Sequence, residues 1–270
     1  MPSRPLDATP SVAETLLAET RNPLFVSPPV RLARAVACSL RTGDGEARLL
    51  LTPDEASSLF GEFRAATAAA QAIDDGRLAV RTTDELTESL TLGHGAVWVH
   101  VRTDDHISSL STTDDEATDA FREPFEERWD DAGTYAVDVP SRRVLLDTFG
   151  DRWPDAADTL SGAIEGAGAL WADEAVDSVG LCTLVGARHE LFSIELGEWA
   201  RDIGFSSRTE VARAKERLTE AGIVETRRVP NGVGRPRQQL ELADDEFASV
   251  PPEDLVPAAR ERITRGASPE

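Results

Sequence analysis

Apolar residues in the first half of the chain follow two spacings in turn, which is the pattern of strands that alternate with helices. Helical spacing predicts helices over residues 11–19, 31–40, 53–73, 84–90, 114–131 and 141–153. Short apolar runs predict strands over residues 47–51, 78–82, 96–101, 107–111 and 135–139. The run 96–101 is apolar on both faces, so we expect it at the centre of the sheet, with 107–111 as its hairpin partner. This half is therefore predicted to be an α/β domain over residues 1–155.

The second half changes to helices followed by a pair of short strands. Three helical stretches come first, over residues 173–190, 193–203 and 206–221, and Ser193 is a candidate cap for the second. Gly222 ends the third, at a position where a left-handed backbone favours glycine. Strand-like runs over residues 223–229 and 238–242 then flank a basic, turn-rich loop. This order predicts a winged helix-turn-helix domain, of α+β class, over residues 173–243.

Two further segments are expected outside these domains. Pro154 and the Gly- and Ala-rich stretch 161–169 predict a hinge or linker helix over residues 156–172. The Asp- and Pro-containing residues 244–270 are expected to form an acidic tail, with a loose helix followed by disorder.

Charge is unevenly distributed along the chain, which has a net charge of −21. Residues 206–237 contain eight basic and four acidic residues, a net charge of +4 against −25 for the remainder. Lys215 is the one lysine, whereas acidic residues number 49. Abundant carboxylates with almost no lysine are typical of proteins from a salt-rich cytoplasm. We therefore interpret the acidic surface as a halophilic adaptation, and the basic segment as a candidate binding surface.

The third helix of the predicted winged helix has the features of a DNA-reading helix. Ser207 and Glu210 match a capping box, so the helix start is well defined and can approach a phosphate. Placing successive residues 100° apart turns Val211 and Leu218 inward. Arg208, Thr209 and Arg213 then lie where side chains reach base edges in the major groove.

The loop between the two strands resembles a wing. Gly232, Gly234 and Pro236 shape a tight turn, and Arg235 and Arg237 stand near its tip, suited to phosphates or the minor groove. Arg227 and Arg228 are adjacent on a strand, so only one of them can face DNA. The candidate DNA-binding residues are Ser207, Arg208, Thr209, Arg213, Lys215, Arg217, Arg227, Arg228, Asn231, Arg235 and Arg237.

Residues 195–207, 211–218 and 221–225, together with the Gly-Arg-Pro-Arg sequence of the loop, resemble archaeal winged-helix transcription regulators. With the acidic α/β half, the whole chain resembles the haloarchaeal TbsP-type regulators, which act beside the sugar-sensing TrmB regulators. The resemblance is specific in its order of elements over residues 173–243, and it is a general likeness over residues 1–155. It implies control of transcription in central carbon metabolism.

Catalytic, cofactor and metal chemistry is not indicated. His94, His100 and His106 recur every six residues, but strand positions six apart are roughly 20 Å from one another, which is too far for one metal site. Cys38 and Cys182 are expected to be reduced thiols in the core. The sequence has no phosphate-binding loop, dinucleotide-binding turn or nucleophile elbow, and no catalytic residues or cofactors are expected.

Three interpretations follow from these patterns. The first is a cytoplasmic, homodimeric regulator that binds double-stranded promoter DNA, with a first domain that senses an effector or pairs the subunits. The second is a winged-helix protein-interaction module whose basic face docks a partner of the transcription machinery. The third is a metabolic enzyme with an appended regulatory domain. No apolar run is long enough to cross a membrane, and no leader sequence is apparent, so we expect no membrane partner.

Overall fold

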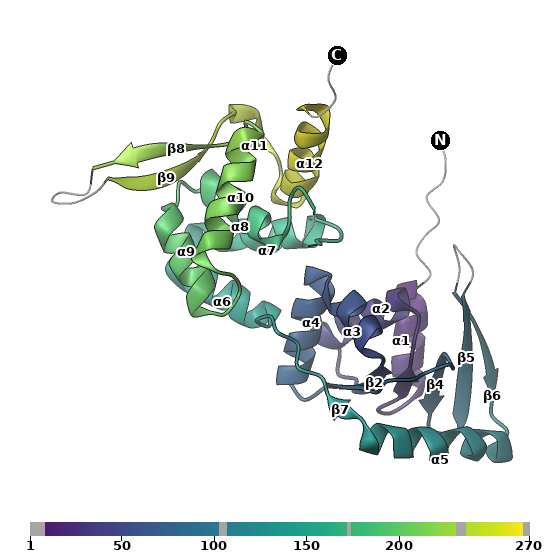
Figure 1. Cartoon of the computed structure of the whole chain (residues 1–270). Coiled ribbons are helices and arrows are strands. Elements are labelled where there is room, and N and C mark those ends of the chain that lie inside the picture. Colours follow the sequence, from purple (N-terminus) through teal and green to yellow (C-terminus); the bar gives the residue numbers. More distant parts are fainter. Residues whose placement is uncertain (1–8, 103–106, 172–173, 231–235, 267–270) are drawn as a thin grey trace, which may run out of the picture. The chain divides into compact units, whose positions relative to one another are not determined.

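The computed structural model describes residues 9–102, 107–171, 174–230 and 236–266. The chain divides into two compact units, Met1–Ser141 and Arg142–Glu270. Figure 1 shows a sheet flanked by helices in the first unit, and helices with one two-stranded hairpin in the second. The predicted order, an α/β domain followed by a winged helix-turn-helix, is confirmed. No helix among the described residues is long and apolar enough to cross a membrane.

The first unit is built around a seven-stranded mixed sheet with the strand order β6-β5-β4-β1-β2-β3-β7. Its strands are β1 (Leu24–Val26), β2 (Ala47–Leu51), β3 (Leu78–Thr82), β4 (Leu90–Gly93), β5 (Ala96–Arg102), β6 (Ile107–Thr112) and β7 (Gly133–Thr134). The neighbours β1, β2 and β3 are parallel, and the other strands join antiparallel. Helices connect the parallel strands, as crossover connections require.

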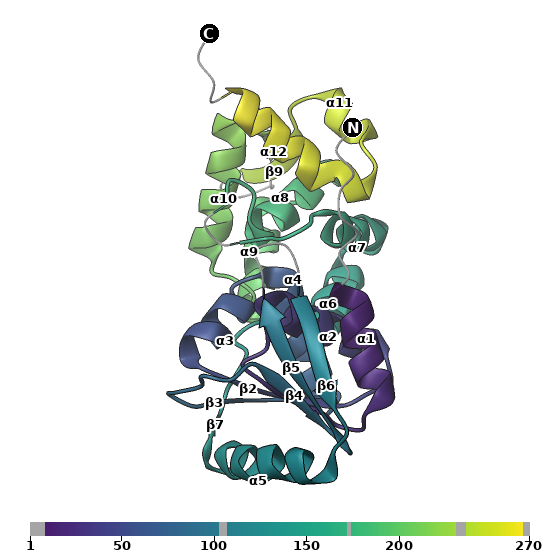
Figure 2. The ribbon, with the colours of Figure 1, turned by 90° about the vertical axis from the view of Figure 1, so that its right-hand side faces the viewer.

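Helices cover both faces of this sheet (Figures 1 and 2). Those on one face are α1 (Thr9–Glu19), α2 (Val30–Thr42), α3 (Pro53–Phe60) and α4 (Phe63–Asp74). The other face carries α5 (Asp115–Asp131). Because side chains alternate along a strand, Phe25 packs with the four helices, whereas Leu24 and Val26 pack with Phe125 and Trp129 of α5.

The single helix predicted over residues 53–73 is broken in two. Thr52 and Glu55 form a capping box at the start of α3, which ends at Phe60. The buried carboxylate of Glu62 then accepts the backbone N–H groups of Arg64 (3.0 Å) and Ala65 (2.9 Å) and starts α4. A side-chain cap inside an apolar helical pattern therefore ends one helix and begins another.

Other predictions for the first unit were wrong in detail. Residues 84–90 do not form a helix, and the short strands β1 and β4 were missed because each offers only three or four residues of pattern. Residues 135–139 lie outside any strand, since pairing stops at Thr134. β5 pairs on both sides but lies next to the edge strand β6 rather than at the centre. Its apolar residues Val99 and Val101 are exposed on one face.

The boundary between the units lies at Ser141 rather than at residue 155. The helix predicted to close the first domain is α6 (Arg142–Arg152), and it packs within the second unit. Its fully buried Phe149 contacts the rings of Trp153 and Trp199, with centroids 4.8 and 5.1 Å away. Aromatic contacts to a residue 50 positions later in the chain cannot be read from local spacing.

Residues 156–172 are not a hinge over their described part. They contain the end of η1 (Pro154–Ala156) and all of α7 (Ala157–Gly166), whose Leu160 and Ile164 are buried. A Cβ atom at Gly166 would lie 1.8 Å from the carbonyl oxygen of Glu253. The small residues that suggested flexibility therefore allow a close approach between α7 and the segment near Glu253.

The described part of residues 244–270 is folded rather than a loose tail. It forms α11 (Asp245–Ser249), η2 (Pro252–Asp254) and α12 (Leu255–Gly266). Leu255, Val256 and Ala259 are fully buried. Arg260 donates to the carbonyl oxygens of Ala167 (3.0 Å) and Ala169 (2.8 Å), which fixes α12 beside the end of α7.

The winged helix-turn-helix consists of α8 (Ser178–Arg188), α9 (Ser193–Asp202), α10 (Arg208–Glu220), β8 (Val224–Val229) and β9 (Arg237–Leu242). α8 begins later than residue 173 because Asp177 caps it, accepting the Gly180 N–H at 2.7 Å. Ser193 is the first residue of α9 and not its cap, which is Phe192. Phe192 also forms an isolated antiparallel bridge with Gln239, so the hairpin is anchored to the start of α9.

Candidate nucleic-acid interface

The start of α10 is fixed by the predicted capping box. Ser207 Oγ accepts the Glu210 N–H at 3.1 Å, and Glu210 accepts the Ser207 N–H at 2.8 Å and the Ser206 hydroxyl at 2.9 Å. The hydrogen bonds from Ser207 and Ser206 lower the pKa of Glu210, with the backbone bond from Ser207 as the largest cause. Glu210 is therefore held as a carboxylate that organises the first turn of the helix.

One face of α10 is buried and the opposite face is open. Val211, Ala214 and Leu218 pack inward, as the 100° spacing predicts. Arg208, Thr209, Ala212, Arg213, Glu216 and Arg217 are exposed. Among the described residues, Arg213 forms no salt bridge or hydrogen bond, and its charge is one of the causes that lower the pKa of the nearby Glu210. A guanidinium on an exposed helix face that donates no hydrogen bond inside the protein can bind an external acceptor without first breaking one.

α9 and α10 approach closely at the turn between them. A Cβ atom at Gly197 would lie 3.4 Å from Cγ of Arg208 and 3.6 Å from its Cα. Gly204 adopts a φ of +70° in the connecting turn, a conformation that glycine adopts without strain. These two glycines let the start of α10 pack closely against α9 at the buried Gly197.

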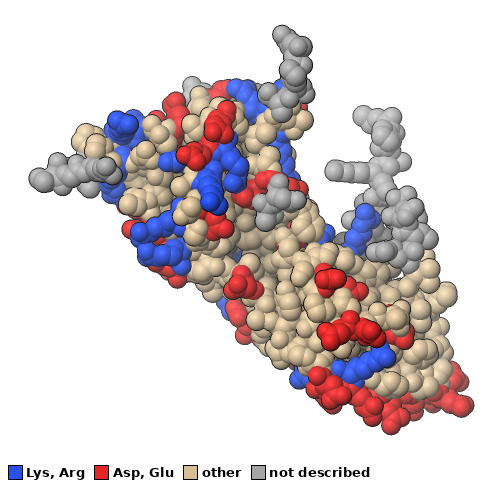
Figure 3. Space-filling view, in the orientation of Figure 1, with Lys and Arg blue, Asp and Glu red and all other residues tan. Residues whose placement is uncertain are grey.

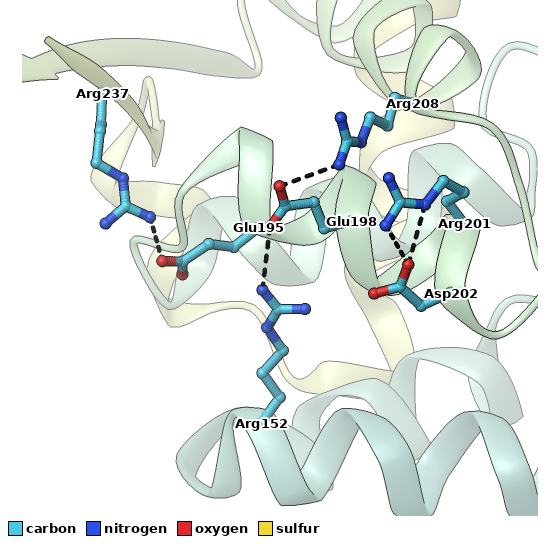
Figure 4. Close-up of polar contacts among 7 residues, drawn as sticks. All are labelled: Arg152, Glu195, Glu198, Arg201, Asp202, Arg208 and Arg237. Atoms are coloured by element: carbon cyan, nitrogen blue, oxygen red, sulfur yellow. Dashed lines mark hydrogen bonds and ion pairs between the residues drawn. The ribbon is translucent and has the colours of Figure 1, made fainter. Parts of the chain in front are cut away.

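Carboxylates on α9 pair with two of the candidate DNA-binding arginines, Arg208 and Arg237 (Figure 4). Glu198 accepts from Arg208 at 3.1 Å and lies 3.6 Å from Arg152 of α6. Glu195 pairs with Arg237, whose guanidinium also stacks 3.9 Å from the centroid of Phe192. These carboxylates were not among the predicted site residues, although their spacing of three places them on one face of a helix.

The two adjacent arginines of β8 point to opposite faces of the hairpin. Arg227 pairs with Glu190 at 3.4 Å and with Glu241 on β9. Arg228 lies opposite Gln238, whose side-chain oxygen accepts a hydrogen bond from Lys215 of α10 at 2.7 Å. Directly opposed residues share a face, so Arg228 and not Arg227 lies on the α10 side of the hairpin.

The remaining candidates divide into three groups. Arg217 is committed to Asp177, the cap of α8, at 2.7 Å, which ties α10 to α8. Thr209 is exposed on the first turn of α10. Asn231 and Arg235 lie outside the described residues.

Basic and acidic side chains are interleaved over this part of the second unit. Figure 3 shows Lys and Arg over the hairpin, α9 and α10, with Asp and Glu between them. In the first unit, the same view shows Asp and Glu concentrated over α5. The surface around α10 therefore has arginines interspersed with carboxylates rather than an unbroken basic patch.

The histidines and cysteines do not form a metal site in the part of the chain that the structure describes. His100 is buried between the hydroxyls of Thr91 (2.7 Å from Nε2) and Ser109 (2.8 Å from Nδ1), so it joins β4, β5 and β6. Burial lowers its pKa from 6.5 to about 4. Cys182 is buried, and burial raises the pKa of its thiol, but Cys38 is exposed, so the prediction of two core thiols was wrong for Cys38. His106 is not among the described residues.

Both halves of the chain match models of known protein families. Residues 2–140 match the family described as "Transcriptional regulator TbsP-like, N-terminal", and residues 141–260 match "Transcriptional regulator TbsP-like, C-terminal HTH domain". Among solved structures, the chain is similar to TrmBL2, described as an archaeal chromatin protein with a novel mode of DNA binding, at 18% identity and a TM-score of 0.36. That match covers 47% of this chain and 51% of TrmBL2. No curated protein matches the chain.

Proposed function

Because the chain belongs to the TbsP-like family of transcriptional regulators, a family of DNA-binding proteins and not of enzymes, we propose that α10 reads the sequence of duplex DNA. In a helix-turn-helix, the N-terminal part of the second helix enters the major groove. Here that part carries Arg208, Thr209 and Arg213 on its exposed face. Arginine pairs with guanine through two hydrogen bonds, and the small Ala212 leaves room for a thymine methyl group.

The hairpin supplies contacts that position the domain on DNA. Arg228 and Lys215 lie on the α10 side, and Arg237 stands at the base of the loop beside α9. These side chains suit phosphate oxygens, which fix the register of a protein on the duplex without reading its sequence. Asn231 and Arg235, which lie outside the described residues, are proposed as DNA contacts from the sequence alone, and Ser207 offers the amino end of α10 to a phosphate. Arg227 and Arg217 are paired with carboxylates of the same unit, so they contribute only to the electrostatic potential around the proposed interface.

Internal ion pairs on this face are weak enough to be exchanged for phosphate contacts. Arg208 and Glu198 have side chains that are 49% and 35% exposed. Exposed pairs of this kind contribute roughly 0.2–1 kcal/mol, which closely spaced phosphates can replace. The carboxylates of α9 therefore compete with DNA for Arg208 and Arg237 and release them when DNA binds.

The observation that carries this proposal is the capped first half of α10, where the exposed Arg213 forms no salt bridge or hydrogen bond inside the described part of the chain. The test is genome-wide chromatin immunoprecipitation of the tagged full chain, compared with Arg213→Ala and with Arg31→Ala. Arg31 is an exposed arginine of α2, so the control removes the same charge from the first unit. We expect sharp promoter peaks for the wild type and the control, and their loss or displacement in Arg213→Ala.

The opposite results have separate meanings. Peaks that are unchanged in Arg213→Ala would show that α10 is not the reading helix. No enrichment of the wild type under several nutrient conditions would contradict DNA binding and favour a winged helix that docks a protein partner.

The proposal extends to the biological setting that the family resemblance implies. We propose that the targets are genes of central carbon metabolism, that the chain acts as a homodimer in a salt-rich cytoplasm, and that the first unit senses a small-molecule effector or pairs the subunits. The large acidic excess of the chain, at −21, supports the salt-rich setting. Two half-sites contacted together raise specificity, which supports the dimer.

A further inference from the structure

The first unit has one open sheet edge that differs from its other edge. β7 closes one side with only two residues, and very short edge strands resist pairing with other chains. β6 closes the opposite side with six residues, and in the described part of the chain it has a neighbour on one side only. Its outer edge therefore presents a row of backbone N–H and C=O groups.

This edge lacks the charges that normally protect an open strand. β6 contains no charged residue, and neither do residues 96–101 of β5, although 29% of the chain is charged. Natural edge strands of monomers commonly carry lysine, proline or an inward-pointing charge to prevent pairing. Their absence over two neighbouring strands marks β6 as a strand that can accept a partner.

Apolar side chains gather on the same two strands. Leu110 of β6 is 69% exposed, and Val99, its partner across the ladder, is 40% exposed. Val101 is 48% exposed, and it shares a face with Val99 because the two are separated by two positions. That face is the one covered by α5 further along the sheet, where Val97 packs with Phe125. The apolar surface therefore continues the α5-side core out to the edge.

The edge strand is held in register from the opposite face. His100 joins Thr91 of β4 to Ser109 of β6, and burial keeps its imidazole neutral. Ile107 packs against the core beneath the helices. β6 is thus a fixed element of the sheet, and its outer hydrogen-bonding groups are presented in a defined geometry.

We infer that β6 pairs antiparallel with β6 of a second copy of this chain, so that the two sheets become continuous through a two-fold axis perpendicular to them. Antiparallel pairing of a strand with itself is self-complementary, because each copy gives and receives the same backbone hydrogen bonds. Such an axis keeps the two α5 faces on one side. Leu110, Val99 and Val101 of the two copies then meet in one apolar strip.

Charge favours a second copy at this place over other parts of the first unit. Each chain carries −21, so two copies repel wherever acidic surfaces meet. α5, with eight acidic and two basic residues, is such a surface. Residues 96–101 of β5 and all of β6 carry no charged side chain, so these strands bring no carboxylate of their own to the contact. Added salt screens the residual repulsion between the copies, so the dimer should strengthen as KCl rises.

The β6 interface rests on the homodimer of the proposed function. Its test uses no DNA, so the interface and the proposed DNA binding can fail separately. Sedimentation velocity of the full chain over a concentration series, at about 0.2 M and about 2 M KCl, gives the dimer dissociation constant at two screening lengths. Leu110→Arg places two like charges beside the axis and should raise that constant by on the order of hundredfold. Ser57→Arg adds the same charge on the exposed face of α3 and should change it by no more than about twofold.

A second variant tests the geometry. A nitroxide attached through Leu110→Cys, in a Cys38→Ser background that removes the exposed native thiol, reports the distance between copies. Neighbouring strands lie about 4.8 Å apart and a six-residue strand is about 20 Å long, so we expect a spin–spin distance below roughly 30 Å. A monomeric wild type at both salt concentrations, a dimer that Leu110→Arg leaves intact, or a longer distance would each overturn the inference.

Discussion

The surface around α10 and the edge formed by β5 and β6 are both exposed, but the first is rich in charged side chains and the second is nearly free of them. Around α10, arginines and carboxylates alternate, and most arginines have an internal partner. Along β5 and β6, residues 96–101 and 107–112 contain no charge. The first arrangement suits a charged ligand that competes for arginines, and the second suits a copy of the same acidic chain. Salt should therefore weaken one interaction and strengthen the other.

The largest expected effect is the fall of DNA affinity with salt. If about four phosphates are contacted, by Lys215, Arg228, Arg235 and Arg237 as proposed, a tenfold rise in KCl lowers the affinity by roughly three to four powers of ten. Fluorescence anisotropy of a labelled promoter duplex measures this slope. Over the same salt range the affinity between the two copies of the chain should rise. If salt weakened both DNA binding and dimerisation, the contrast between the two surfaces would be wrong.

The next effect concerns the histidine that fixes the edge strand. The pKa of His100 is about 4 in the folded chain and 6.5 when unfolded, so the unfolded state binds a proton first as the pH falls. The contribution of His100 to the free energy of unfolding is then fully present above about pH 6.5 and is lost as the pH falls toward 4. The loss between pH 7 and pH 5 is about 2 kcal/mol. Urea denaturation followed by the amide resonances of β5 measures this loss.

His100→Gln is the matched variant for that measurement, because glutamine can still bond to both hydroxyls but does not titrate in this range. It should lose about 2 kcal/mol of the pH dependence while the contribution of the carboxylates remains. An unchanged pH dependence in His100→Gln would show that His100 is not the group responsible.

The smallest effect concerns the carboxylates of α9. Glu198→Gln and Glu195→Gln remove the internal competitors for Arg208 and Arg237, so DNA affinity at low salt should rise by about two- to fivefold for each. Glu261→Gln, on α12, removes the same charge from an exposed pair and serves as the control. Weaker binding in Glu198→Gln would indicate that the carboxylate orients Arg208 for DNA rather than competing for it.

Local signals predicted α10, the element on which the proposed function depends. Ser207, Glu210 and Gly222 marked the two ends of α10 in the sequence, and the structure has the cap and the left-handed glycine at those residues. Such signals act over three or four residues and need no tertiary information. The same is true of β8 and β9, whose predicted limits are within one residue of the observed ones.

The features that local sequence patterns did not predict depend on contacts between residues far apart in the chain. The boundary at Ser141 depends on Phe149 meeting Trp199, and the folded end of the chain depends on Arg260 reaching Ala167. Glycines at positions such as Gly166 were interpreted as a hinge, whereas they make room for a neighbouring segment. The pairing of Glu195 and Glu198 with arginines from other elements could not be predicted either, because the spacing of residues along one helix does not show which other element packs against it.

The most direct test that α10 reads DNA is selection of binding sequences from a random duplex pool by the purified full chain and by Arg213→Ala. We expect the wild type to select two half-sites related by a two-fold axis and about 34 Å apart, one helical turn of DNA. Arg213→Ala should lose its preference at one base position in each half-site, with about 1–3 kcal/mol less discrimination there. No enriched sequence, or an identical preference in Arg213→Ala, would contradict the proposal that α10 reads DNA.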